Sequence, residues 1–411
     1  MIIMNILILT NEYPYEKYPR ANWTKAVPYF AEEWARMGHK VVVIVNTSTF
    51  PAAYYWGAAI LSKIRRSTDF SGTGISDTHW KQEFSFADQG VTVFNRPMLK
   101  YRSGGKYSKK AIENQIGKIK GLLKEEGFVP DVITAHWINP QLYILVQLGA
   151  YYNAKTAFVF HRDYEKKRCD KYEVAKYIGM VDHVGCRSKT AAERISEYLP
   201  LNSLPFVCSS GIPELFIREA DLTGGHMFCG DKMKIVTAGR LVKYKCFDAV
   251  IRTFDSLKKN NPDFEAELTI VGDGPEKEAL AALGQERGLL NNSLFFTGRI
   301  SREAVQNYLK NNDVFVLISK NETFGLVYLE AMLQGCIVVA SRFGGVDGII
   351  IDGENGFLCE ENNEEQLAEI LDRIRNMTAE EKRTMSAKAI QTACEYTDFK
   401  AAEKYLKAIT G

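Results

Sequence analysis

Short apolar runs that alternate with helix-like stretches constrain the fold of this 411-residue chain more than any other feature. The runs are brief and rich in β-branched residues, which is typical of strands buried on both faces of a parallel sheet. A first series is expected at Asn5–Leu9, Lys40–Val45, Asp131–Ala135 and Ala157–Phe160. A second series is expected at Lys234–Thr237, Leu268–Val271, Leu294–Thr297, Val314–Ile318 and Ile337–Ala340. Because strand–helix–strand alternation requires crossover connections, the two series predict an α/β fold with two doubly wound parallel-sheet domains that face each other.

The length of the chain agrees with more than one domain, since a domain has roughly 150 residues. The boundary is expected near Gly211–Pro213, where the first series has ended and a loop-like stretch, Ala220–Gly230, follows. We therefore expect an N-terminal domain over residues 1–212 and a C-terminal domain over residues 213–390. The last segment, Ala379–Gly411, has a helical pattern throughout.

Residues 48–108 fit the alternation poorly and are expected to form an insertion in the loops above the sheet, where ligands bind in such folds. Within it, Pro51–Arg66 fits an interfacial helix, and a helix buried against the domain fits equally well. Eight Lys/Arg and a single acid, Glu113, lie between Lys100 and Lys124. This excess suits anionic lipid headgroups or a phosphate-bearing acceptor, although a solvated surface is the favoured interpretation.

The overall chemistry excludes several classes of protein. The net charge of +2 gives no global field that would select nucleic acid. Eight scattered cysteines without a C-x-x-C pair indicate reduced core thiols, not a disulfide framework or a zinc site. No apolar run approaches the roughly 18 residues of a membrane span, and Met1–Leu9 is expected to be a buried strand instead of a signal peptide. We expect a cytoplasmic protein, with peripheral contact at the inner membrane surface as a further expectation.

The most informative stretch runs from Asn321 to Gly335, where a helix is expected to follow a buried strand. The backbone N–H groups of Thr323 to Leu326 would then point at an anion, and Gly325 would allow its close approach. Glu330 lies in the second turn of this otherwise apolar helix, and a buried carboxylate needs donors or a cation. A ribose diol would supply two donors, whereas a salt bridge to a neighbouring Lys or Arg is the structural alternative.

Three further segments follow predicted strands at the carboxyl ends where such sheets bind ligands. Arg240 and Lys245 follow the first strand of the second series, and two cations are able to neutralise a diphosphate without a metal. A pair of solvated loop charges is the alternative for them. Val271–Pro275 contains Gly272 and Gly274, a weak nucleotide signal that a plain β–α turn explains nearly as well. Phe295–Ile300 ends another strand and is able to offer backbone groups to a base.

In this order and spacing, the four segments resemble the C-terminal half of glycosyltransferase family 4, whose members have the two-domain, Rossmann-like GT-B fold. Glu322 and Glu330 match the E-x7-E pair of that family, and Arg240 and Lys245 match its diphosphate-binding cations. The resemblance is strongest from about residue 232 to 360 and weaker upstream. There, Asp131–Trp137 and His161–Asp163 are similar to strand-end histidine motifs, and Pro19–Trp23 stands where the family usually has a Gly-Gly loop.

The resemblance implies a role for each matching residue. Glu330 would hold the donor ribose, Glu322 the hydroxyls of the transferred sugar, and His161 the region near the anomeric carbon. The candidate catalytic residues are His161, Arg240, Lys245 and Glu322, and the candidate nucleotide-binding residues are Gly272, Gly274, Arg299, Ile300, Thr323, Phe324, Gly325, Leu326 and Glu330. The resemblance also implies that a C-terminal helix, residues 391–411, crosses back to the N-terminal domain.

The implied activity is a retaining transfer of sugar from a nucleoside-diphosphate sugar, with a UDP-sugar favoured. The acceptor would be a glycan, a lipid-linked molecule or a small molecule, in surface polysaccharide or glycoconjugate synthesis. No Asp-x-Asp occurs, so neither a metal nor another cofactor is expected. A nucleotide-sugar 2-epimerase of the same fold and a non-catalytic sugar-nucleotide-binding protein are the alternatives. A solute-binding protein is disfavoured because the chain has free thiols and lacks a signal peptide pattern.

Overall fold

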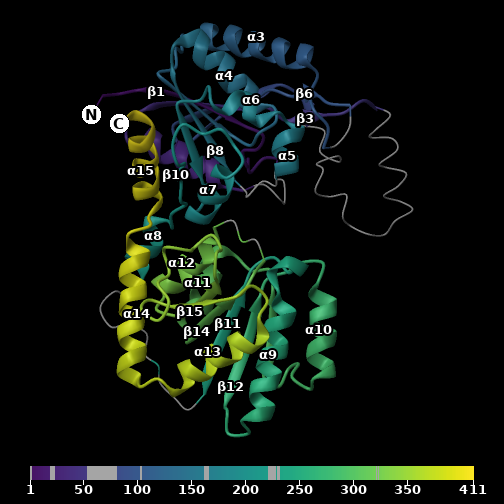
Figure 1. The fold of residues 1–411 in the computed structure, drawn as a ribbon, viewed down its shortest axis with the longest axis vertical. Helices are drawn as coiled ribbons and strands as arrows, with labels where there is room; N and C mark the ends of the chain where they lie inside the picture. Colours follow the sequence, from purple (N-terminus) through teal and green to yellow (C-terminus); the bar gives the residue numbers. More distant parts are fainter. Residues whose placement is uncertain are drawn as a thin grey trace. The chain divides into compact units, whose positions relative to one another are not determined.

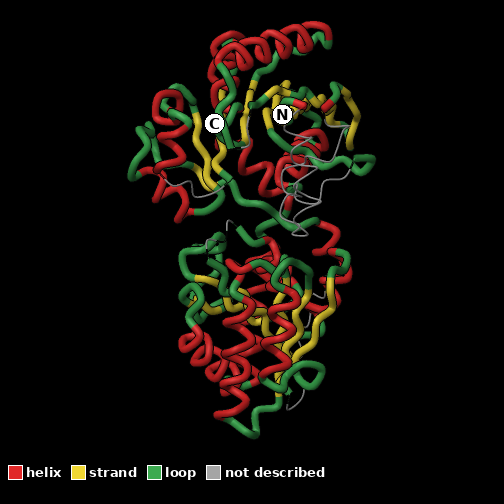
Figure 2. The backbone as a smooth tube through the Cα atoms, turned by 90° about the vertical axis from the view of Figure 1, so that its right-hand side faces the viewer, coloured by secondary structure: helices red, strands yellow, loops and turns green. Residues whose placement is uncertain are grey.

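The computed structural model describes residues 2–18, 24–52, 81–101, 104–161, 166–220, 228, 232–320, 322 and 324–411. The chain divides into two compact units (Figure 1). Unit 1 consists of Met1–Arg187, Ala191–Cys208 and Ala401–Gly411, and unit 2 consists of Ser188–Thr190 and Ser209–Lys400. The fold is α/β with a mainly parallel sheet in each unit, and Figure 2 shows helices beside the strands of each sheet.

In the described residues, the main sheet of unit 1 has eight strands in the order β10-β9-β8-β7-β1-β2-β5-β4. The strands are β1 (Asn5–Thr10), β2 (Lys40–Val45), β4 (Phe84–Asp88), β5 (Val91–Asn95), β7 (Val132–His136), β8 (Lys155–Phe160), β9 (His183–Cys186) and β10 (Phe206–Val207). Along β1, Leu7 and Leu9 belong to one core cluster and Ile6 and Ile8 to another, so both faces of the strand are buried. This two-sided burial explains why the run is continuously apolar.

The described helices of unit 1 surround this sheet. They are α1 (Ala26–Arg36), α3 (Lys109–Glu125), α4 (Gln141–Tyr152), α5 (Lys166–Lys171), α6 (Val174–Ile178), most of α7 (Lys189–Ser196) and most of α15 (Asp398–Thr410). The C-terminal helix α15 packs on unit 1 from Ala401 onward. The indole N–H of Trp34 donates to the Ala402 carbonyl at 2.9 Å, and the Tyr405 and Phe30 rings meet edge to face at 5.2 Å.

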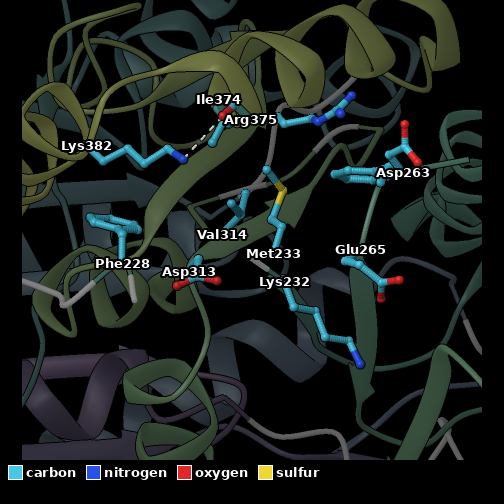
Figure 3. Close-up of a pocket in the computed structure, with 11 residues that line it drawn as sticks. Phe228, Lys232, Met233, Asp263, Glu265, Asp313, Val314, Ile374, Arg375 and Lys382 are labelled. Carbon is cyan, nitrogen blue, oxygen red and sulfur yellow. Dashed lines mark hydrogen bonds between the residues drawn. The ribbon is translucent and has the colours of Figure 1, made fainter. Parts of the chain in front are cut away.

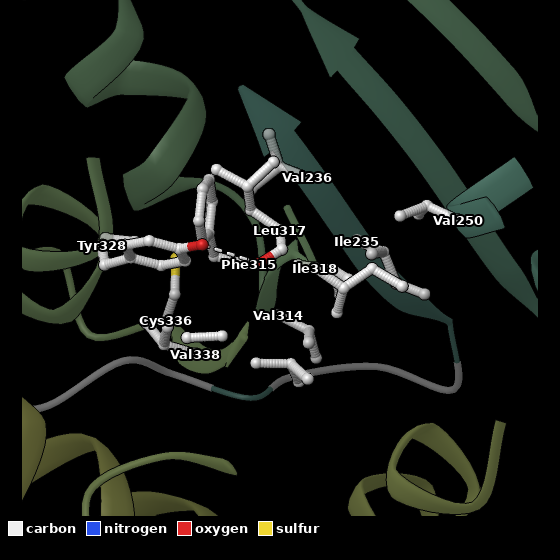
Figure 4. Packing of buried hydrophobic residues seen from close by; sticks show 14 of the residues in the cluster. Ile235, Val236, Val250, Val314, Phe315, Leu317, Ile318, Tyr328, Cys336 and Val338 are labelled. Carbon is white, nitrogen blue, oxygen red and sulfur yellow. Dashed lines mark hydrogen bonds between the residues drawn. The ribbon is translucent and has the colours of Figure 1, made fainter. Parts of the chain in front are cut away.

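The sheet of unit 2 is parallel throughout its described strands, in the order β13-β12-β11-β14-β15-β16. The strands are β11 (Met233–Ala238), β12 (Ala266–Val271), β13 (Leu294–Gly298), β14 (Val314–Leu317), β15 (Ile337–Ser341) and β16 (Phe357–Cys359). The helices are α8 (Glu214–Glu219), α9 (Phe247–Asn260), α10 (Lys277–Glu286), α11 (Arg302–Lys310), α12 (Leu326–Leu333), α13 (Glu364–Asn376) and α14 (Ala379–Cys394). Figure 4 shows the core between β11, β14 and α12, where the Tyr328 hydroxyl donates to the Leu317 carbonyl at 2.7 Å.

Two expectations from the sequence are wrong. Residues 48–108 are not loop throughout, because β5 extends the main sheet beside β2 and β4 pairs antiparallel with β5. The apolar alternation of Val91–Asn95 is too short to stand out among the aromatic residues around it. The helical pattern of Ala379–Gly411 is also interrupted, since Thr397 pairs with Ile212 between α14 and α15. Pro19–Trp23 and most of the Pro51–Arg66 segment, from residue 53 on, lie outside the described residues.

Candidate functional site

The strand order of unit 2 has its switch point between β11 and β14. From β11 the chain first adds β12 and β13 on one side, and then β14, β15 and β16 on the other. The loops that leave β11 and β14 therefore diverge, and such a divergence is where doubly wound sheets bind ligands. The two loops remain connected by a hydrogen bond of 2.7 Å from the Lys320 N–H to the Tyr244 carbonyl. Unit 2 thus places its candidate cations and carboxylates at the expected edge of the sheet.

Lys245 and Glu322 meet at this switch point. Lys245 ends a 3-10 turn (Lys243–Lys245) after β11, Glu322 follows β14, and the two side chains form an ion pair. Their side chains are 13% and 12% exposed, so the pair is only partly reached by water. Arg240 lies at the same edge and is exposed. The structure therefore brings two candidate catalytic residues into contact and places a further cation in the same loop as Lys245.

Gly272 and Gly274, which follow β12, are required because their backbone packs closely against the backbone of the loop after β11. Leu241 N–H donates to the Asp273 carbonyl at 3.0 Å, which joins the loops after β11 and β12. A Cβ on Gly272 would lie 1.9 Å from the Gly239 carbonyl oxygen, and one on Gly274 would lie 2.4 Å from the Leu241 oxygen. Gly272 and Gly274 thus have a structural role at the candidate edge, whatever ligand contacts they make.

The helix expected after β14 begins with a left-handed residue. Gly325 has φ +75° and caps α12, whose first residue is Leu326. A Cβ on Gly325 would meet the Tyr328 ring at 2.4 Å, so both the dihedral angle and the space demand glycine. Phe324 is buried beside it, whereas Thr323 lies outside the described residues. The N-terminus of α12 leaves backbone donors directed at the same edge as Lys245.

Glu330 is buried, with 4% of its surface exposed, and two side chains of α11 hold its carboxylate. The Arg302 Nε donates to Oε1 at 2.8 Å, and the Gln306 amide donates to Oε2 at 3.1 Å. The Arg302 guanidinium also lies 5.2 Å from the centre of the Phe216 ring. The salt bridge that stood as the structural alternative is therefore present. Arg302 and Gln306 were missed from the sequence, where their spacing of four residues on an amphipathic helix was the available signal.

The remaining candidates in unit 2 lie after β13. Arg299 is exposed, whereas Ile300 packs partly buried against the core of the unit. The pKa of the exposed Asp273 is lowered, most of all by the hydrogen bond from Lys277. The hydrogen bond from the Gly274 N–H and the nearby charges of Lys277 and Arg299 lower it further. The edge at β12 and β13 is therefore a mixed-charge surface, unlike the cationic loop after β11.

His161 belongs to unit 1, where it follows β8 at the carboxyl edge of the sheet. Its Nε2 atom lies 2.7 Å from Nδ1 of His136, and its ring stacks on Trp137 at 4.3 Å. Burial, and then the nearby Arg187 cation, lower the pKa of His136 to about 3. His136 is therefore neutral near pH 7 and orients His161 through a hydrogen bond between the rings. Sequence reasoning recognised the two histidine motifs but did not predict that His136 and His161 touch.

A cavity of about 150 Å³ in unit 2 lies at the opposite edge of the sheet (Figure 3). Met233 and Val314 line it at the starts of β11 and β14, and Asp263 lines it before β12. The Lys382 ammonium reaches across it to the Arg375 carbonyl at 3.4 Å. Because ligands of doubly wound sheets bind at the carboxyl ends, this cavity is separate from the candidate site.

The described residues contain no group of three or more His, Cys, Asp or Glu side chains with the geometry to hold a metal ion. Among the described helices, none combines the length and the apolar character that a bilayer crossing requires. The described cysteines are free thiols, and all of them except Cys394 are buried.

Comparison with known proteins agrees with the geometry. The family model described as "Glycosyl transferases group 1" matches residues 226–392. An uncharacterized glycosyltransferase of Haemophilus influenzae is 36% identical over 143 residues, which cover 34% of this chain and 39% of that protein. One of Methanocaldococcus jannaschii is 27% identical over 303 residues, 70% of this chain and 76% of that protein. The chain spans less than two fifths of the length of the first curated relatives it matches.

Solved structures extend the likeness to the whole fold. HepE of Anabaena, solved in complex with UDP, superposes with a TM-score of 0.68 at 15% identity. The superposition covers 99% of this chain and all of that one, so it includes both doubly wound units. Residues 226–392 therefore match the glycosyl transferases group 1 family model, and the chain as a whole has the GT-B fold.

Proposed function

We propose that this protein is a retaining, metal-independent glycosyltransferase of family 4 that uses a nucleoside-diphosphate sugar, with a UDP-sugar favoured. The observation that carries the proposal is the meeting of Lys245 and Glu322 at the switch point of unit 2, with the N-terminus of α12 at the same edge. The family match over residues 226–392 and the UDP bound to HepE support a nucleotide sugar as donor.

In this proposal the protein stabilises the charge of the departing diphosphate. Lys245 and Arg240 supply two cations, and the α12 amides near Phe324 and Gly325 supply a helix N-terminus. Lys245 is held by Glu322 before the donor arrives, which fixes the ammonium in place. The same carboxylate is then available to accept hydrogen bonds from sugar hydroxyls. Catalysis therefore rests on positioning and electrostatics.

The remaining roles concern the nucleoside and the acceptor side. Each carboxylate oxygen has two lone pairs, so Glu330 is able to accept from a ribose diol while Arg302 and Gln306 hold it. Arg299 and Ile300 flank the base in the proposal. His161, oriented by the neutral His136, contacts the transferred sugar from unit 1. The acceptor is a glycan, a lipid-linked molecule or a small molecule in surface glycan or glycoconjugate synthesis, and the protein acts in the cytoplasm.

A donor screen tests the activity directly. Thermal shift with UDP, GDP, ADP and NAD identifies the base, because a ligand at 100 times its Kd stabilises by about 2.7 kcal/mol. Release of nucleoside diphosphate from matching sugar donors, with and without EDTA, then measures turnover and its metal requirement. NMR of the product reports the anomeric configuration. Stabilisation by none of the nucleotides, or full loss of turnover in EDTA with rescue by Mg²⁺ or Mn²⁺, contradicts the proposal.

Arg240 provides the sharpest single-residue test. Arg240→Ala should weaken UDP binding by roughly 1.5–3 kcal/mol, the scale of a hydrogen bond to a charged group. Lys243→Ala is the matched control, since Lys243 is an exposed cation in the same loop. Calorimetry measures both affinities. An equal loss of UDP affinity in the two variants would assign the effect to the general charge of the loop. Unchanged UDP affinity in Arg240→Ala would show that Arg240 does not belong to the site.

A further inference from the structure

Unit 1 contains a cavity of about 600 Å³ between helices α3, α4 and α6. Helix α4 packs against both of the other two helices (Figure 1). A volume of this size is typical of a pocket for a small organic ligand. Among the described residues, the cavity wall includes Asn139, in the loop that leaves β7, but neither His136 nor His161. The cavity is therefore separate from the histidine pair, although the same loop borders both.

Aromatic rings and aliphatic side chains form one part of the cavity wall. Tyr143 on α4 and Tyr177 on α6 meet edge to face, and their ring centres lie 4.4 Å apart. Both tyrosines are partly exposed, so their rings are able to lie against a ligand. Ile112 and Ile116 line the cavity from a single face of α3, because they are four residues apart. This part of the wall suits a ligand with C–H groups that pack on aromatic rings.

Uncharged polar groups accompany this apolar surface. Gln147 lies four residues after Tyr143 on α4 and is exposed. Within the described part of the chain, its side-chain amide makes no hydrogen bond. The Asn139 amide donates to the Gly105 carbonyl at 3.2 Å, which leaves its side-chain oxygen as an acceptor. A wholly apolar occupant would cover such groups without bonding to them, which costs free energy, whereas hydroxyl groups would satisfy them.

Most of the charged side chains in the wall are already paired with each other. Lys106 lies 3.0 Å from Glu173, and Lys109 lies 3.8 Å from Glu113. The hydrogen bond from Lys106 is the largest cause that lowers the pKa of Glu173, so this carboxylate is ionised and paired near pH 7. Lys176 also lines the cavity, and it is exposed to water. Because the charges of the two pairs offset each other, the wall favours an uncharged ligand.

We propose that this cavity binds a neutral sugar, whose C–H face lies against Tyr143 and Tyr177 and whose hydroxyl groups bond to the Gln147 amide. A sugar matches the wall because it combines an apolar face with many hydroxyl groups and carries no charge. Since the cavity wall excludes the histidine pair, this sugar is a different one from the sugar that His161 contacts in the proposed function. That it is a further unit of a glycan acceptor rests on the proposed function, whereas the sugar site itself does not.

Saturation-transfer NMR titrations of the full chain test the site with the methyl glycosides of glucose, mannose, galactose and N-acetylglucosamine. At least one glycoside should bind, and more tightly than cyclohexanol, which has a six-membered ring but a single hydroxyl. Gln147→Ala should weaken this glycoside roughly five-fold, the scale of one hydrogen bond. Gln285→Ala is the matched control and should leave the affinity unchanged, because Gln285 is an exposed glutamine of α10 in unit 2.

Tyr177→Leu tests the aromatic part of the wall. Leucine keeps an apolar side chain at this position but removes the aromatic face, so the affinity for the same glycoside should fall roughly five-fold. Melting temperature reports whether the variant is folded. Gln147→Ala keeps the proposal testable if Tyr177→Leu unfolds, since alanine is favoured at an exposed helix position.

Three results overturn the proposal. The first is binding of none of the four glycosides, and the second is wild-type glycoside affinity in Gln147→Ala or in folded Tyr177→Leu. The third is binding of cyclohexanol or glucose 6-phosphate at least as tight as that of the best glycoside, because the site would then select an apolar or an anionic ligand. UDP affinity of the wild type is measured in parallel. Loss of sugar binding in a protein that binds UDP overturns this inference alone, whereas sugar binding without UDP binding contradicts only the proposed function.

Discussion

At the scale of single residues, Glu330 combines a structural contact with a proposed contact to ligand. Its carboxylate is held by Arg302 and Gln306, so Glu330→Gln leaves the Arg302 guanidinium without its counter-charge. Removing one partner of a buried ion pair lowers the free energy of unfolding by about 3–5 kcal/mol. Because the Arg302 side chain is 29% exposed, we expect Glu330→Gln to lower it by roughly 2 kcal/mol. Urea unfolding of the ligand-free protein measures this loss.

A double-mutant cycle separates the two roles of Glu330. Glu330→Gln combined with Arg302→Gln should recover most of the stability, since neither charge is then left unpaired. UDP affinity should stay low in the double variant if the carboxylate binds ribose. Recovery of both stability and UDP affinity would show that Glu330 acts solely within the protein.

His136 should make unit 1 sensitive to acid. Its pKa of about 3 in the folded state lies below the ordinary value of 6.5, so the unfolded chain binds more protons between these values and stability falls as the pH drops below 6.5. The free energy of unfolding should therefore be about 2 kcal/mol lower at pH 5 than at pH 8 because of His136. His136→Asn should reduce the difference between urea midpoints at pH 8 and pH 5. An unchanged difference would show that His136 titrates normally.

At the scale of elements, Gly325 and Gly288 form a matched pair with nearly the same backbone angle. Gly325 has φ +75° and Gly288 has φ +67°. A Cβ added at Gly325 would meet the Tyr328 ring, whereas a Cβ added at Gly288 would have no atom within 4 Å. Gly288→Ala should therefore cost roughly 1–2 kcal/mol from the left-handed conformation and leave UDP binding intact. Gly325→Ala should cost more and weaken UDP binding, because α12 must shift. Equal losses of stability in the two variants would show that the contact with Tyr328 is easily relieved.

The elements also show how far sequence reasoning reaches. Buried parallel strands such as β11 and β14 carry their own apolar signal, so the edge that holds Lys245 and Glu322 was predictable. The partner of Glu330 was not, because it depends on which face of α11 meets α12, a property of tertiary packing. Strand β5 was hidden for a related reason. Its short run is fixed by pairing with β2, whose partner residues lie 50 positions earlier in the chain.

At the scale of the whole molecule, unit 1 is built from two distant parts of the chain. Tyr405 and Ile409 of α15 are buried against the same cluster as Trp34. Burial of one such side chain contributes about 1.5–3 kcal/mol to the free energy of unfolding. The three side chains Tyr405, Leu406 and Ile409 together therefore contribute as much as the net stability of a domain. A chain that ends at Lys400 should therefore keep a folded unit 2 and lose the cooperative unfolding of unit 1. Calorimetry with and without UDP distinguishes the two transitions, and two intact transitions would contradict this expectation.

The division of unit 1 between distant segments has a consequence for biosynthesis. A ribosome that has completed residues 1–208 must add about 190 more before Ala401–Gly411 exists. At translation rates of 5–20 residues per second this takes roughly 10–40 s, long compared with the collapse of a nascent chain. Throughout that interval the face of Phe30 and Trp34 that α15 later covers is open to chaperones and to other nascent chains. The order of emergence thus allows unit 2 to mature first, although unit 1 is made first.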